Sequence, residues 1–122
     1  MGKTILTVDD SRTMRNMLVM ALSNAGHTVV QAEDGQHGVE VLAQNPDIDV
    51  IITDINMPRM DGYMFIDHVR RDPRARATPI LVLSTESEAS KKQRARDAGA
   101  TGWIVKPFDA EKLVAAVRRI AP

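Results

Sequence analysis

The chain of 122 residues carries sixteen basic and sixteen acidic residues, is 43% hydrophobic and 26% charged, and contains no cysteine. The balanced charge argues against a nucleic-acid or membrane-surface binder, because both depend on excess positive charge, and the lack of cysteine excludes disulfides, thiolate metal sites and thiol nucleophiles. No apolar run approaches the ~20 residues of a membrane span and no secretory segment opens the chain, so we expect one soluble cytoplasmic domain, residues 1–122.

Five apolar, β-branched segments are the predicted strands. They are Thr4–Val8, Thr28–Gln31, Val50–Thr53, Ile80–Leu83 and Gly102–Val105. The first, third and fourth are almost continuously apolar, which is typical of strands that are covered on both faces.

Segments of helical period separate these strands. The first has an apolar stripe from Met14 to Ala25, followed by Gly26 where a helix should end. Further helical stretches are Gly38–Leu42, Tyr63–Val69 and Leu113–Ile120. The segment Ser87–Ala98 offers only alanines as apolar anchors, so we expect this helix to be weakly held. Because strand and helix alternate five times, the predicted fold class is α/β, a parallel sheet with helices on both faces.

Polar residues cluster where the predicted strands end. The first strand is followed by Asp9 and Asp10, the third by Asp54 and the fourth by Ser84, and the fifth leads into Lys106. Ligands of open parallel sheets bind beyond these carboxyl ends, so we expect the side chains to meet in one shallow pocket. Taken singly, such residues are usually turn, cap or surface residues. Their coincidence at the strand ends is what indicates a functional site.

The chemistry of these groups favours phosphoryl transfer. Three converging carboxylates repel one another and raise one another's pKa unless a cation compensates. Oxygen donors without cysteine favour Mg²⁺ as that cation. A carboxylate beside Mg²⁺ suits phosphoryl transfer, with Asp54 as the nucleophile that forms an acyl phosphate. The Lys106 ammonium would neutralise one phosphoryl oxygen, and the Ser84 hydroxyl would donate to another.

The motifs VDDS, DINMPRMDG, LST and KPF together resemble the receiver domain of two-component response regulators, across the whole chain. The resemblance implies a flavodoxin-like, doubly wound sheet of five parallel strands in the order 2-1-3-4-5, with five helices. It also implies that a sensor histidine kinase of the CheA type phosphorylates Asp54. Ser84 would be the switch hydroxyl, and Lys106 would contact the phosphoryl group.

The resemblance further implies a set of Mg²⁺ ligands. Asp10, Asp54 and the backbone carbonyl of Asn56 would bind the ion directly, whereas Asp9 would bind it through a water molecule. The magnesium site and the phosphoacceptor would thus share the same pocket.

Three positions are expected to tune or transmit the signal, and a fourth is expected to follow a cis peptide bond. Trp103 falls at the family's aromatic switch position, where Tyr or Phe is more frequent. Asn56 and Glu86 fall at variable positions that help to set the rate of autodephosphorylation. The Lys106–Pro107 peptide bond is expected to be cis, as is typical of the family.

By likeness to single-domain chemotaxis regulators, we expect a stand-alone response regulator that signals by phosphorylation-dependent binding to another protein. A flagellar motor switch protein is the leading candidate for that target, and neither a nucleic acid nor a membrane is expected as a partner. The chain would be a signalling phosphoacceptor that assists its own phosphorylation and autodephosphorylation, not a turnover enzyme.

Two alternatives stay open at this point. A phosphate sink or phosphorelay intermediate would use the same pocket without binding a motor. A Mg²⁺-dependent phosphohydrolase with an aspartyl nucleophile is the second, but such enzymes need an acid two residues beyond the nucleophile. The chain has Asn56 at that position.

Overall fold

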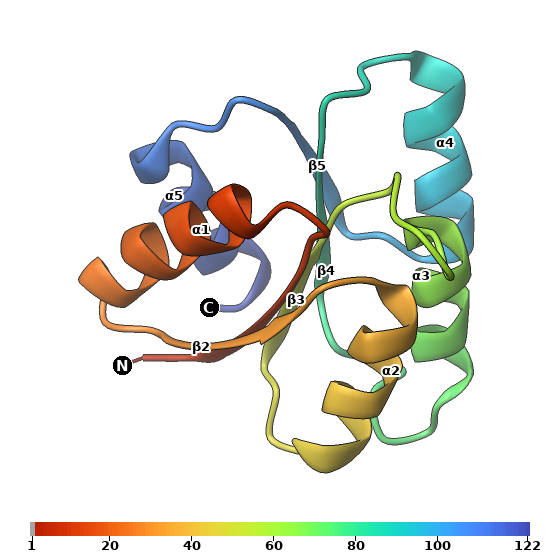
Figure 1. Ribbon diagram of the computed structural model, residues 1–122, viewed down its shortest axis with the longest axis horizontal. Coiled ribbons are helices and arrows are strands. Elements are labelled where there is room, and N and C mark those ends of the chain that lie inside the picture. Colours follow the sequence, from red (N-terminus) through yellow and green to blue (C-terminus); the bar gives the residue numbers. More distant parts are fainter. Residues whose placement is uncertain (1) are drawn as a thin grey trace.

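The structure, a computed structural model, describes residues 2–122 as five strands that alternate with five helices (Figure 1). The strands are β1 Thr4–Val8, β2 Thr28–Ala32, β3 Val50–Thr53, β4 Ile80–Ser84 and β5 Gly102–Val105. The helices are α1 Arg12–Asn24, α2 Gly35–Gln44, α3 Gly62–Arg71, α4 Ala89–Ala98 and α5 Ala110–Ile120. All four strand pairings are parallel, in the order β2-β1-β3-β4-β5, which confirms the predicted fold.

Each face of the sheet packs against its own set of helices. Helices α1 and α5 lie on one face, and α2, α3 and α4 lie on the other (Figure 1). The core on the α1–α5 face is built around Ile5, Leu22 and Leu113, and the core on the opposite face around Leu6 and Phe65, all of which are fully buried. Neighbouring residues of β1 therefore point into different cores, as the pleat of a strand covered on both faces requires.

Two strand ends and the start of α4 differ from the prediction by one or two residues, and α2 and α5 begin three residues before the helical stretches predicted for them. Strand β2 extends to Ala32 because that residue pairs with Val8, and β4 extends to Ser84 because that residue pairs with Val105. Helix α4 begins at Ala89 rather than Ser87, after Glu88 in an extended conformation. The remaining strands have the predicted ends. Among residues 2–122, no helix has the length and apolar character needed to cross a membrane.

Candidate functional site

The site begins where β1 and β3 end side by side. The register pairs Val8 with Thr53, so Asp9 and Asp54 leave the sheet at the same level. One carboxylate oxygen from each of Asp9, Asp10 and Asp54 lies within 4.8 Å of the others. Asp9 and Asp54 are buried, whereas Asp10 is exposed. The structure thus brings the three predicted acids together at the carboxyl edge of the sheet.

Lys106 supplies positive charge to this acidic cluster. Its Nζ donates to Asp9 Oδ2 and to Asp54 Oδ2, at 2.9 Å each. Burial alone lowers the pKa of Lys106, but the hydrogen bonds to Asp54 and Asp9 outweigh burial and raise that pKa above its usual value. Burial raises the pKa of Asp9, and the hydrogen bonds that it accepts from Lys106 and Ser11 only partly offset this effect. Lys106 is therefore held as a cation against two buried carboxylates.

Backbone groups fix the orientation of the two buried acids. The N–H of Ile55 donates to Asp54 Oδ1 at 2.7 Å, and the N–H of Ser11 donates to Asp9 Oδ1 at 2.9 Å. Arg15 Nη1 donates to the backbone carbonyl of Asp9 at 2.7 Å, which ties α1 to the end of β1. Each of these carboxylates has one oxygen bound to the backbone and the other bound to Lys106. The acidic groups are therefore preorganised before any ligand arrives.

The donor set fits Mg²⁺. Three carboxylates within 4.8 Å of one another are hard oxygen donors, which Mg²⁺ prefers. The resemblance to receiver domains likewise implies Mg²⁺ at an acidic pocket of this kind. Chemically, the arrangement can hold a dication and one lysine around a single buried carboxylate, Asp54.

The switch hydroxyl predicted at Ser84 lies one strand away from the acids. Ser84 ends β4, the strand next to β3, and its side chain is fully buried. Its Oγ accepts a hydrogen bond from the N–H of Glu86 at 3.2 Å. The Glu86 carboxylate lies 3.0 Å from Lys91 Nζ on α4 and pairs with that residue. Ser84 and Glu86 are thus linked to the β4–α4 loop, residues 85–88.

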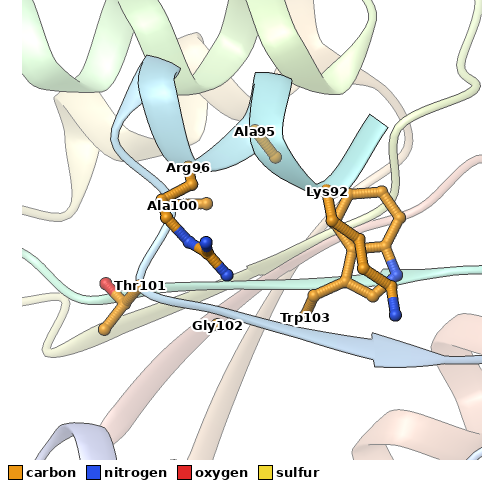
Figure 2. Close-up of a pocket in the computed structure, with 7 residues that line it drawn as sticks. All are labelled: Lys92, Ala95, Arg96, Ala100, Thr101, Gly102 and Trp103. Carbon is orange, nitrogen blue, oxygen red and sulfur yellow. The ribbon is translucent and has the colours of Figure 1, made fainter. Parts of the chain in front are cut away.

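Trp103 is connected to the same loop. Its indole N–H donates to the backbone carbonyl of Glu86 at 3.0 Å, and its side chain is half-buried. Figure 2 shows Trp103 with Lys92 and Ala95 around a small pocket between α4 and β5. The predicted aromatic position is therefore in contact with the loop that follows Ser84.

The remaining predicted positions lie in the loops that follow β3 and β5. Asn56 is exposed in the β3–α3 loop, residues 54–61. The Lys106–Pro107 peptide bond is cis.

Sequence reasoning missed an ion pair that joins the β3–α3 loop to α2. Arg59 Nη2 lies 2.6 Å from Asp34 Oδ2, and Arg59 Nε donates to the same oxygen at 2.7 Å. The two residues are 25 positions apart. No local pattern predicts this pairing, because it depends on how the loop lies across α2 after folding.

Comparisons with known proteins place the chain in one family. The family model of the response regulator receiver domain matches residues 5–118. The chain is 41% identical over 110 residues to chemotaxis protein CheY1 of Helicobacter pylori, covering 89% of each chain. It is 38% identical over 110 residues to a chemotaxis protein CheY homolog of Campylobacter jejuni, covering 89% of this chain and 85% of that one. The structure is similar to that of chemotaxis protein CheY4 of Vibrio cholerae, with a TM-score of 0.92, 42% identity and coverage of 98% of this chain and 99% of the other.

Proposed function

This chain belongs to the response regulator receiver family, and from that premise we propose that it is a phosphorylation-controlled signalling protein whose phosphoacceptor is Asp54. Receiver domains of this kind are signalling regulators rather than classical enzymes. We further propose that residues 1–122 act as one receiver domain and take the phosphoryl group from a sensor histidine kinase of the CheA type. The single observation that carries the proposal is the position of Asp54, a buried carboxylate held between two further acids and Lys106.

The transfer step uses the Asp54 carboxylate as the nucleophile. A new P–O bond forms to Asp54 while the bond between phosphorus and the imidazole nitrogen of the donor breaks, and the electron pair leaves with that nitrogen. The Ile55 N–H holds Asp54 Oδ1, so the carboxylate is oriented before the donor arrives. The Lys106 ammonium neutralises charge on the phosphoryl oxygens at the position where it now contacts Asp54 and Asp9.

Mg²⁺ would be held by Asp10, Asp54 and the Asn56 carbonyl, and through water by Asp9, and would supply positive charge beside the phosphoryl oxygens. The protein's own contribution is to keep these donors together although they repel one another.

The signal leaves the site through Ser84 and the β4–α4 loop. The Ser84 hydroxyl turns from the Glu86 N–H towards a phosphoryl oxygen, and this movement changes the loop that also carries the carbonyl bound by Trp103. Helix α4 and its surroundings have two conformations, and phosphorylation changes their relative populations without refolding the helix. Asn56 and Glu86 set the rate at which autodephosphorylation resets the switch.

The target is a protein that binds the phosphorylated form, and a flagellar motor switch protein is the leading candidate because relatives at 38–41% identity are named as chemotaxis proteins. Pull-down from lysate with and without beryllofluoride, a mimic of the acyl phosphate, tests the proposal. The expected result is a partner recovered only with beryllofluoride, and lost in an Asp54→Asn variant. Equal recovery in both states would contradict the switch and favour a phosphate sink or relay intermediate.

The role of Trp103 is tested in the same assay. We expect Trp103→Ala to lower the affinity of the beryllofluoride-bound form for its partner, since the indole links the loop to β5. Unchanged affinity would remove Trp103 from the mechanism.

A further inference from the structure

The β3–α3 loop contains an unfavourable backbone conformation. Within residues 2–122, Arg59 is the one residue other than glycine with a positive φ angle, 66°. This left-handed region is unfavourable for residues that carry a Cβ atom, and glycine adopts it freely. Some other interaction must therefore hold Arg59 in place, and it must be stronger than the preference of the backbone.

Two interactions act on this residue. The N–H of Met60 donates to the Pro58 carbonyl at 2.7 Å and closes a tight turn over Arg59, and the Arg59 side chain forms an ion pair with Asp34. Two nitrogens of the Arg59 guanidinium, Nε and Nη2, contact Asp34 Oδ2 at 2.7 and 2.6 Å, and Glu33 lies further away at 3.9 Å. The Asp34 side chain is only 4% exposed, whereas that of Arg59 is 58% exposed. A buried carboxylate is costly unless it is paired, so Asp34 strongly favours the position of Arg59 that pairs with it.

Asp34 is itself fixed at the beginning of α2. Its Oδ1 accepts a hydrogen bond from the N–H of His37 at 2.9 Å, so it is the N-cap of that helix. Next to it, the N–H of Gly35 donates to the carbonyl of Met60 at 3.2 Å, and a Cβ atom at Gly35 would lie only 2.5 Å from that oxygen. The loop is therefore docked on the first turn of α2 at two adjacent points.

The other part of the loop reaches the phosphoacceptor. The N–H of Ile55 holds Asp54 Oδ1, and the carbonyl of Ile55 accepts from the N–H of Gly62 at 2.8 Å. Asn56 lies between this contact and the Arg59 ion pair. The backbone at Asn56 is therefore held by the contacts of Ile55 before it in the chain and by the ion pair of Arg59 after it.

We propose that Arg59 is a positioning residue of the phosphoryl site. By pairing with Asp34, it fixes the β3–α3 loop on α2 and so holds the Asn56 carbonyl and the Asp54 carboxylate where they can share Mg²⁺. The inference rests on the proposed function, because it gives Arg59 a task only if this pocket binds the ion.

The test compares Mg²⁺ affinity with stability in four variants of the intact chain. Mg²⁺ is titrated into the protein while the backbone amide NMR signals of Ile55 and Asn56 are followed, and urea unfolding is measured on the same samples. The variants are Arg59→Gly, Asp34→Asn, the double variant and Arg71→Ala. The last is a matched control, because it removes the ion pair with Asp67 on an exposed part of α3, away from the pocket.

We expect Arg59→Gly to raise the Kd for Mg²⁺ roughly three- to tenfold, less than the ~10- to 100-fold that removal of a direct hydrogen-bond partner of a ligand causes. Asp34→Asn should act in the same direction, since asparagine keeps the helix cap but loses the charge. The double variant is decisive. It has no buried unpaired charge and no unfavourable φ angle, so its stability should approach that of the wild type while its Kd stays raised.

Two results would overturn this inference alone. One is a wild-type protein that binds Mg²⁺ with the same Kd as Arg59→Gly. The other is a double variant that regains both stability and affinity, which would make Arg59 merely structural. A wild-type protein that bound no Mg²⁺ at these amides would instead overturn the proposed function, and this inference with it.

Discussion

Helices α3 and α4 are both ten residues long and lie next to each other on the same face of the sheet, but they are held in different ways (Figure 1). Helix α3 buries five residues, Gly62, Tyr63, Phe65, Ile66 and Val69, and its N-cap Asp61 accepts a hydrogen bond from Met64 N–H. Helix α4 buries only Ala95, and its N-cap residue Glu88 makes no side-chain cap bond. The weak anchoring expected for α4 from its sequence is thus seen in the structure.

Polar contacts replace core packing around α4. The Arg94 guanidinium lies over the Tyr63 ring, 4.0 Å from its centroid, and Lys91 pairs with Glu86 at 3.0 Å. At the other end of the helix, the Arg70 guanidinium donates to the carbonyl of Gly99 at 2.8 and 3.0 Å. Ala95 of α4 and Trp103 of β5 lie together around the small pocket between these two elements (Figure 2). Partly exposed contacts of this kind cost little to rearrange, so we expect α4 to rearrange more readily than α3.

The largest expected effect is the loss of the α3 core residue Phe65. Its side chain is fully buried, and its ring fills the space where a Cβ atom at Gly38 would approach to 2.8 Å. We expect Phe65→Ala to lower the free energy of unfolding by about 3–5 kcal/mol, measured by urea denaturation. In α4, Ala95→Gly should cost only about 1 kcal/mol. Equal losses of unfolding free energy in the two variants would contradict the stronger anchoring of α3.

A smaller difference is expected at the helix caps. Asp61→Ala removes the side-chain bond to Met64 N–H, which should lower the free energy of unfolding by about 1 kcal/mol. Glu88→Ala removes no such bond and should leave unfolding nearly unchanged. Urea denaturation of both variants is the measurement, and a larger cost at Glu88 would show that its side chain caps α4 in solution.

The contact between Arg94 and Tyr63 should act on α4 alone. We expect Arg94→Ala to lower the free energy of local opening of α4 by about 0.5–1 kcal/mol, as is typical of a cation over an aromatic ring. Native-state hydrogen exchange of the α4 amides measures this opening, with Arg96→Ala as a control of equal charge change on the same helix. If both variants lowered the free energy of local opening equally, the loss of a positive charge, not the contact with the Tyr63 ring, would be the cause.

The smallest expected effect is a local destabilisation of α4 at high pH. The hydrogen bond with Glu86 raises the pKa of Lys91 above its ordinary value of 10.5, and Glu88 and Tyr63 act on the same ammonium. A raised pKa in the folded protein means that the stabilisation is complete below pH 10.5 and is lost as the pH rises through the folded-state pKa.

We therefore expect the NMR signals of α4 residues to show local destabilisation of that helix above about pH 10.5. The signals of α3 residues in the same spectra should show no such change. Glu86→Gln removes the pair and should abolish this difference between the helices. If the local destabilisation of α4 persisted in that variant, another group would be its cause.

The sequence predicted the sheet and the meeting of Asp9, Asp54 and Lys106 because both follow from local pattern and parallel geometry. Apolar runs mark the strands, and the carboxyl ends of parallel strands share one edge. The apolar pattern predicts that β4 ends at Leu83, one residue too early. Ser84 is a polar residue that continues the strand because it pairs with Val105 on β5.

The contacts that fix the loops could not be predicted in this way. Arg59 reaches Asp34, 25 positions away, and Arg94 reaches the ring of Tyr63 on another helix. Long, partly exposed side chains carry no periodic signal, and their partners are decided by how whole elements pack. The same is true of the bond from the Trp103 indole to the Glu86 carbonyl.

Phosphorylation of Asp54 is expected to change α4 while α3 stays in place. Hydrogen–deuterium exchange with and without beryllofluoride and Mg²⁺ tests this expectation most directly, with Asp54→Asn as the control. We expect the exchange of residues 85–98 to change on addition, while the buried α3 amides of Phe65 and Ile66 stay protected and the control shows no response. Equal changes in both helices, or an unchanged α4 in a protein that binds beryllofluoride, would contradict the account.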